Sequence, residues 1–131
     1  MVETVSLTRA HLAAALAVHV ATETPGTTDE PWVRITLIDD IPNPRSRPLH
    51  HHRAYLQLDC YAGEDGGTVE AESVATDVVA AVTAMSEATH ASGVVTYSKV
   101  TGRRMLPDGD FAPARPRVIV EAALSLHPKA S

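Results

Sequence analysis

The sequence predicts an α+β fold: a four-stranded antiparallel or mixed sheet with helices packed on one face. Two segments have apolar residues at helical spacing and four alternate apolar and polar residues, in the order α-β-β-α-β-β. The length of 131 residues suits one domain, and 44 % hydrophobic residues suffice for one core without disulfides. We therefore expect residues 1–131 to form a single domain.

The first half of the chain predicts a helix followed by a long hairpin. Residues 7–21 have leucine and valine every four positions, with Ser6 or Thr8 as the expected N-cap. Alternation of apolar and polar residues predicts two strands, at residues 32–39 and 53–62. The segment 40–53 between them holds three prolines, which cannot donate to a sheet ladder, so we expect a long loop at the hairpin tip.

The second half predicts another helix and hairpin. Residues 68–89 form the helix, with Thr68 as the N-cap and an apolar stripe of Val74, Val78, Val82 and Met85. The last two strands are expected at residues 94–101 and 115–126. The segment between them, 102–114, is expected to be an exposed hairpin connection.

Side-chain alternation assigns faces to the strands. In the second strand one face takes Ala54, Leu56, Leu58 and Cys60, which places the single cysteine in the core. Three tyrosines are expected on the sheet face away from the core: Tyr55, Tyr61 and Tyr97. Tyrosines on such a face serve either a protein interface or cross-strand pairing within the sheet.

The histidine triplet His50, His51 and His52 lies where the proline loop enters the second strand. Histidine binds zinc, copper and nickel, but neighbouring strand residues point to opposite faces and a structural zinc needs about four ligands. No other histidine or cysteine stands at a metal-site spacing. We therefore predict no metal ligands and interpret the triplet as the base of a protein-facing loop, whose protonation near pH 6 would tune an interface.

Motifs for catalysis or cofactor binding are absent from the sequence. There is no G-x-S-x-G elbow and no phosphate-binding loop, because "GEDGG" lacks the lysine that such a loop needs. The acid pairs Asp39–Asp40 and Asp108–Asp110 are expected in turns, where aspartate caps the backbone. We predict no catalytic residues, no cofactor and no enzymatic activity.

Charge is spread unevenly along the chain, with a net charge of −5 that argues against nucleic-acid binding as the main task. The proline loop carries Arg45, Arg47 and Arg53, whereas the next stretch up to Lys99 holds only acidic charges. Such asymmetry serves solvation or contacts between neighbouring copies. The N-terminus resembles no signal peptide and the longest apolar run is too short to cross a bilayer, so we expect a cytoplasmic protein without membrane contact.

Three stretches resemble one family: "WVRITLIDDIPNPRSR", "RAYLQLDCYAGEDGGTVEAESVATDVVAAV" and "PRVIVEAALSL". In this order, with the strand "LQLDCYA" as the sharpest part and "TGRRMLPDGD" before the last strand, the chain is similar to tail terminator proteins of long-tailed, siphovirus-type actinobacteriophages. The similarity covers roughly residues 30–127.

The resemblance implies a structural virion protein at the head–tail interface, assembled in the host cytoplasm. Tail terminators are small α+β subunits that form a hexameric ring. The ring caps the tail tube, ends polymerisation of the tube protein and meets the head-completion or stopper protein, while DNA passes the lumen without specific binding. Neither catalysis nor a cofactor is implied.

The ring suggests candidate interface residues from the basic loop, the acidic helix and the last hairpin. They are Arg45, Arg47, His50, His51, His52, Arg53, Glu70, Glu72, Asp77, Arg103 and Arg104. We expect an arginine of the loop to meet acids such as Glu70, Glu72 or Asp77 of a neighbour. Three alternatives stay open: another head–tail connector such as a head-completion or stopper protein, a small histidine-dependent metalloprotein, and a small-ligand-binding domain.

Overall fold

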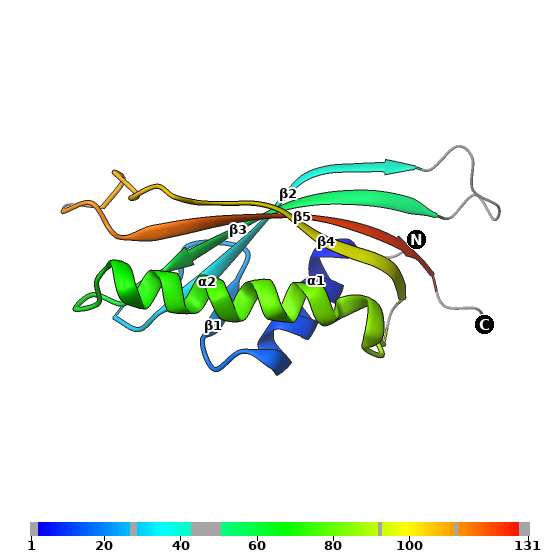
Figure 1. Cartoon of the computed structure of the whole chain (residues 1–131), viewed down its shortest axis with the longest axis horizontal. Helices are drawn as coiled ribbons and strands as arrows, with labels where there is room; N and C mark the ends of the chain where they lie inside the picture. Colours follow the sequence, from blue (N-terminus) through cyan, green and yellow to red (C-terminus); the bar gives the residue numbers. More distant parts are fainter. Residues whose placement is uncertain (1–2, 27–28, 43–50, 92, 112, 129–131) are drawn as a thin grey trace.

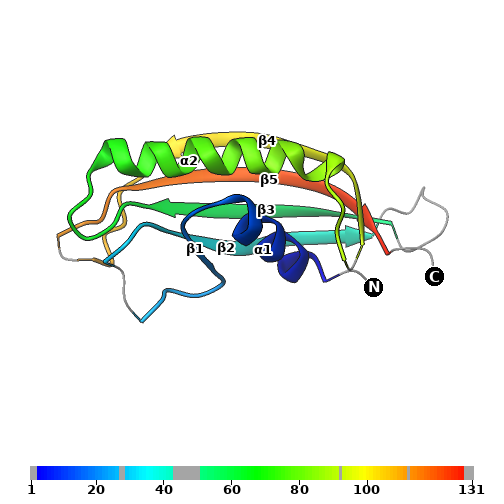
Figure 2. The same cartoon turned by 90° about the horizontal axis from the view of Figure 1, so that it is seen from below.

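The computed structural model describes residues 3–26, 29–42, 51–91, 93–111 and 113–128. It has an α+β architecture, in which two helices cover one face of a five-stranded mixed sheet (Figures 1 and 2). The helices are α1 (Thr4–Ala15) and α2 (Thr68–Thr83), and a short 3₁₀ helix η1 (Ala84–Glu87) follows α2. The strands are β1 (His19–Ala21), β2 (Trp32–Pro42), β3 (His52–Tyr61), β4 (Val94–Met105) and β5 (Arg117–His127).

The sheet has the order β1-β2-β3-β5-β4. Neighbouring strands are antiparallel except β1 and β2, which run parallel. The predicted hairpin of residues 32–39 and 53–62 is confirmed, because β2 and β3 pair from Trp32 opposite Tyr61 to Pro42 opposite His52. The expected four-stranded sheet is wrong in its count, since β1 adds a fifth strand.

The end of the first predicted helix differs from the sequence expectation. The α1 helix stops at Ala15, and residues 19–21 form β1 instead of a last helical turn. This stretch contains Val20, and β-branched residues favour extended backbone when a neighbouring strand can pair with them. The N-cap is Glu3 rather than Ser6 or Thr8, and Thr8 is buried.

Both hairpin connections contain more strand than the sequence predicts. The β2 strand continues to Pro42, so the expected loop 40–53 is shorter, and its middle, 43–50, lies outside the described residues. Proline is tolerated at the strand end, where little of the ladder follows. The β4 strand continues to Met105 through bulges near Thr96 and Thr101, which shortens the predicted connection 102–114.

The core between the helices and the sheet follows the predicted alternation. Inward residues of β3 and β5 are buried, as are the stripe residues of α2 from Val74 to Val82 and Met85 of η1. The α2 helix begins after an N-cap at Gly67 instead of Thr68 and ends before the predicted residue 89. Cys60 lies in this core, where burial, assisted by the charge of Asp59, raises the pKa of its thiol to about 12. The thiol is therefore protonated and shielded at neutral pH.

Candidate interaction surfaces

A polar cluster joins the hairpin base to the start of α1. A bulge between Leu37 and Asp39 changes which face the following residues occupy, so Asp40 lies beside His52 of β3. The Asp40 carboxylate binds the His52 ring through Nδ1 and accepts a 3.2 Å hydrogen bond from the Thr4 hydroxyl of α1. The expected turn at Asp39–Asp40 is wrong because both residues belong to β2.

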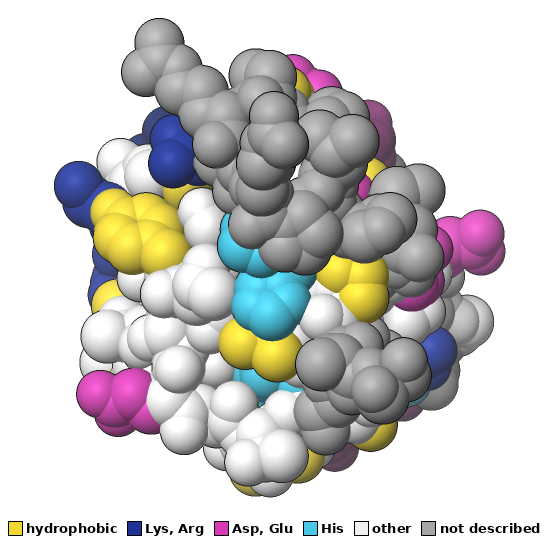
Figure 3. Space-filling view, turned by 90° about the vertical axis from the view of Figure 1, so that its right-hand side faces the viewer, with side chains coloured by type: hydrophobic (Ala, Val, Ile, Leu, Met, Phe, Trp, Pro, Cys, Tyr) yellow, Lys and Arg dark blue, Asp and Glu magenta, His cyan; other side chains and the backbone are white. Residues whose placement is uncertain are grey.

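His52 is buried at 6 % exposure, so its side chain serves this cluster inside the subunit. His51 stands on the neighbouring position and stacks on His127 at the end of β5, with ring centroids 4.5 Å apart. Figure 3 views this end of the molecule and shows histidine side chains in its middle. Among the described residues, no group of three or more histidine, cysteine or acidic side chains is arranged to hold a metal ion.

At the other end of the sheet, the β4–β5 connection covers the face opposite the helices. The Tyr61 ring stacks on Trp32 with centroids 3.9 Å apart, and Phe111 from the connection meets Tyr61 edge-on. The Tyr61 hydroxyl donates a 2.6 Å hydrogen bond to Asp108, which is buried too. Of the two roles expected for the tyrosines, cross-strand pairing is therefore confirmed at Tyr61, which lies opposite Trp32 and is buried. The prediction that the whole connection is exposed is wrong, because Asp108 is buried.

The pKa of the Asp108 carboxyl is lowered in this cluster. Burial would raise the pKa of its carboxyl, but the Tyr61 hydroxyl, the Asp110 backbone N–H and the charge of Arg117 together lower that pKa. Burial and the bond to Asp108 raise the pKa of Tyr61. The ionised carboxylate therefore ties the connection to the end of β3.

Another part of the uncovered sheet face, near the histidines, forms a groove of about 500 Å³. Its walls include Arg53 and Tyr55 from β3 and Tyr97 and Lys99 from β4. Large apolar residues are exposed nearby on β2, namely Ile38 at 59 % and Ile41 at 45 %. Tyrosine and arginine are enriched at protein interfaces, as they are in this groove.

Several predicted interface residues bind partners in the same subunit, and their place at an interface stays a prediction. Arg103 reaches across to α2 and forms an ion pair with Glu72 at 2.5 Å, and Arg104 pairs with Glu121 of β5 at 2.5 Å. The Glu70 carboxylate accepts a 2.6 Å hydrogen bond from the Gly63 backbone N–H. These acids and arginines are thereby engaged within the fold.

Asp77, by contrast, is exposed on α2, and Arg53 is exposed on β3. Arg45, Arg47 and His50 lie outside the described residues. Lys99 is a groove residue that the sequence reasoning missed, because the chain alone does not show that β4 stands two strands away from β3 with β5 between them. The tyrosine pair, Tyr55 and Tyr97, was the available signal for this face.

Comparison with protein families matches residues 5–125 to the family described as tail completion protein gp17. No curated protein matches the chain. No helix in the described part of the chain is long and apolar enough to cross a membrane. The family match extends from the first turn of α1 almost to the end of β5, so it covers every helix and strand of the fold. The chain therefore belongs to the tail completion protein gp17 family of structural proteins of the phage virion.

Proposed function

We propose that this protein is a tail terminator, whose copies form a hexameric ring on the tip of the tail tube. The observation that carries the proposal is the family match over residues 5–125, which places the chain among virion proteins that contact other tail or head proteins. In this role the ring ends polymerisation of the tube protein and joins the tail to the head-completion proteins. The proposal includes no catalytic step, cofactor or metal.

The surface of the subunit supports a role in assembly. Helices cover one face of the sheet, while the opposite face keeps a groove with two tyrosines and two basic residues beside exposed apolar residues of β2. Ile38 and Ile41 of β2 are large apolar side chains exposed to solvent, and an interface would cover them. The net charge of −5 also suits a ring through which DNA slides without sticking.

The test is the mass of the purified protein in solution, alone and mixed with the tail-tube protein of the same phage. We expect a ring-sized species or a short tube that carries the protein at one tip. Polymerisation of the tube protein should stop when this protein is added. A tube of unlimited length in its presence, with no bound protein, contradicts the proposal.

A head-completion or stopper role would give a different result. Such a protein would ignore the tube protein and bind the portal-side assembly instead. The same mixing experiment with purified portal-side components distinguishes the two positions. Host range remains a prediction from the sequence, and infection tests on actinobacteria would check it.

A further inference from the structure

We propose that the groove on the open sheet face receives the acidic corner of a neighbouring copy. The groove is defined by Arg53, Tyr55, Tyr97 and Lys99, and the acidic corner by Asp29, Glu64 and Asp65. This inference rests on the proposed ring, because it names the surfaces through which adjacent subunits of that ring meet. It differs from the pairing of loop arginines with α2 acids that the sequence suggests.

The strand register builds the groove. Arg53 of β3 and Tyr97 of β4 both stand opposite Ser125 of β5. Tyr55 of β3 and Lys99 of β4 both stand opposite Ala123, which precedes Ser125 by two residues on β5. Because β5 lies between the other two strands and carries small residues here, its side chains form a low floor. The tyrosines and cations of β3 and β4 rise on either side as walls.

The two cations of the groove have no side-chain partner among the residues that the structure describes. Four other arginines in the described part of the chain bind acids: Arg34 binds Asp59, Arg103 binds Glu72, Arg104 binds Glu121 and Arg117 binds Asp108. Among the same described residues, the side chains of Arg53 and Lys99 form no hydrogen bond or ion pair, and no acid lines the groove. Figure 3 shows basic side chains gathered beside a hydrophobic patch on one flank of this end of the molecule. Although the net charge of the protein is −5, this groove is suited to bind carboxylates.

The acidic corner has the opposite imbalance. The Glu64 backbone N–H donates a 2.9 Å hydrogen bond to the Asp29 carbonyl, which brings the acids of two loops together. A hydrogen bond to the Asp29 carboxylate, and the charges of Asp29 and Asp65, raise the pKa of Glu64, and the charge of Arg115 offsets this rise only in part. Like charges are therefore crowded at this corner. A cation from another molecule would relieve the repulsion.

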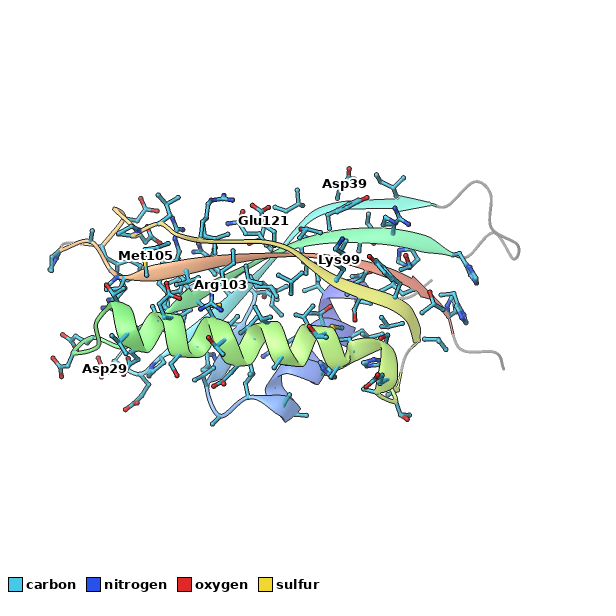
Figure 4. The ribbon with its side chains drawn as sticks, in the orientation of Figure 1. Asp29, Asp39, Lys99, Arg103, Met105 and Glu121 are labelled. Atoms are coloured by element: carbon cyan, nitrogen blue, oxygen red, sulfur yellow. The ribbon has the colours of Figure 1, made fainter. Side chains whose placement is uncertain are left out.

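The positions of the two surfaces favour a second copy as the occupant. Asp29 lies near one end of the molecule, beside the start of α2, and Lys99 lies toward the other end on β4 (Figure 4). Two different, complementary patches on one subunit make a heterologous contact, which repeats from copy to copy and closes into a ring when the rotation allows. Complementary charges also fix the order of subunits and exclude the reversed arrangement.

The test uses two charge-reversed variants that complement each other. The groove variant carries Arg53→Glu and Lys99→Glu, and the corner variant carries Glu64→Lys and Asp65→Lys. Each alone places like charges across every contact, so we expect its ring population to fall by about tenfold or more. Mixed in equal amounts, the variants should alternate around the ring, restore the wild-type mass and contain both chains in equal numbers by native mass spectrometry.

A matched control carries Glu23→Lys and Glu87→Lys, which change the net charge as the corner variant does at two exposed acids outside both surfaces. It should assemble as the wild type does. Thermal unfolding of each variant checks that the subunit is folded. If a reversed variant fails to fold, the neutral changes Arg53→Gln with Lys99→Gln, and Glu64→Gln with Asp65→Asn, replace it and should each weaken the ring.

Three outcomes would overturn the inference while leaving the proposed function intact. The wild type and all variants could form rings equally well, or the mixture could fail to recover what each variant loses. The groove variant could also form normal rings but no longer bind the tube, which would assign the groove to the tube protein. If the wild type neither forms rings nor caps tubes, the proposed function fails and the inference fails with it.

Discussion

Asp40 joins three segments of the chain through one carboxylate. Its two oxygens contact His52 of β3 and Thr4 of α1, so the hairpin base is held against the first helix. Both partners are buried, and a buried polar group that loses its hydrogen bond costs more than the bond itself contributed. The importance of Asp40 therefore lies in the groups that would be left unpaired without it.

We expect Asp40→Ala to lower the free energy of unfolding by about 1–3 kcal/mol, because it leaves the Thr4 hydroxyl and the His52 ring without their partner. Urea denaturation followed by circular dichroism measures the change. Asp77→Ala is the matched control, since Asp77 is exposed on α2 and its loss should cost less than about 0.5 kcal/mol. Equal effects of the two substitutions would show that the cluster contributes nothing.

Asp108 makes the free energy of unfolding depend on pH in the acidic range. Because its pKa is lower in the folded protein than in the unfolded chain, the ionised carboxylate stabilises the fold. This contribution is complete above about pH 4, the ordinary aspartate value, and is lost as the pH falls through the lower folded pKa. We expect Asp108→Asn to be less stable than the wild type at neutral pH, with a difference that shrinks below about pH 4. Urea midpoints across this range measure it, and a constant difference would contradict the argument.

The turn between β3 and α2 depends on the close approach of two backbones. A Cβ added at Gly63 would lie 2.4 Å from the Asp29 carbonyl oxygen, which belongs to the segment before β2. The Gly63 backbone N–H also donates a hydrogen bond to the Glu70 carboxylate of α2. The backbone N–H of the next residue, Glu64, donates a hydrogen bond to the same Asp29 carbonyl. Gly63 thus allows the loop before β2 and the start of α2 to pack together.

We expect Gly63→Ala to destabilise the fold by about 1–3 kcal/mol, because backbone must shift to admit the methyl group. Gly26→Ala is the matched control, since a Cβ at Gly26 has nothing within 4 Å. That change should be neutral or slightly stabilising, because alanine restricts the unfolded chain. Thermal unfolding of both variants tests the difference, and a silent Gly63→Ala would mean that the loop adapts freely.

At the scale of the whole molecule, the charges separate into two unlike surfaces at different places on the sheet and its loops. The groove keeps unpaired cations while the acidic corner crowds carboxylates. In the part of the chain that the structure describes, Arg53 and Lys99 form no ion pair, and the charge of Arg115 only partly offsets the acids around Glu64. If adjacent subunits meet through these two surfaces, as we propose, the contacts should respond to salt.

We expect ring formation to weaken by about tenfold or more between about 0.1 M and 1 M sodium chloride, because the screening length falls from about 10 Å to about 3 Å. Light scattering at fixed protein concentration measures the ring population. Thermal unfolding of the subunit should change far less, since an apolar core holds it. Rings that strengthen with salt would indicate an interface dominated by apolar residues such as Ile38 and Ile41.

The sequence by itself determined the features that depend on local periodicity. The apolar stripe of α2 and the inward faces of β3 and β5 follow from spacing along the chain, and each is buried as predicted. The order of strands and helices also supported the resemblance to phage tail terminators, and the family match confirms a tail completion protein. These features need no knowledge of distant contacts.

Tertiary structure alone decided the rest, because each remaining feature depends on residues far apart in the sequence. The short β1 strand exists only because β2 lies beside it, and Tyr61 is buried only because the β4–β5 connection folds over it. Asp40 reached His52 and Thr4 through a bulge that no local pattern marks. Arg53 and Lys99 line the same groove because β5, the last strand in the sequence, lies between β3 and β4.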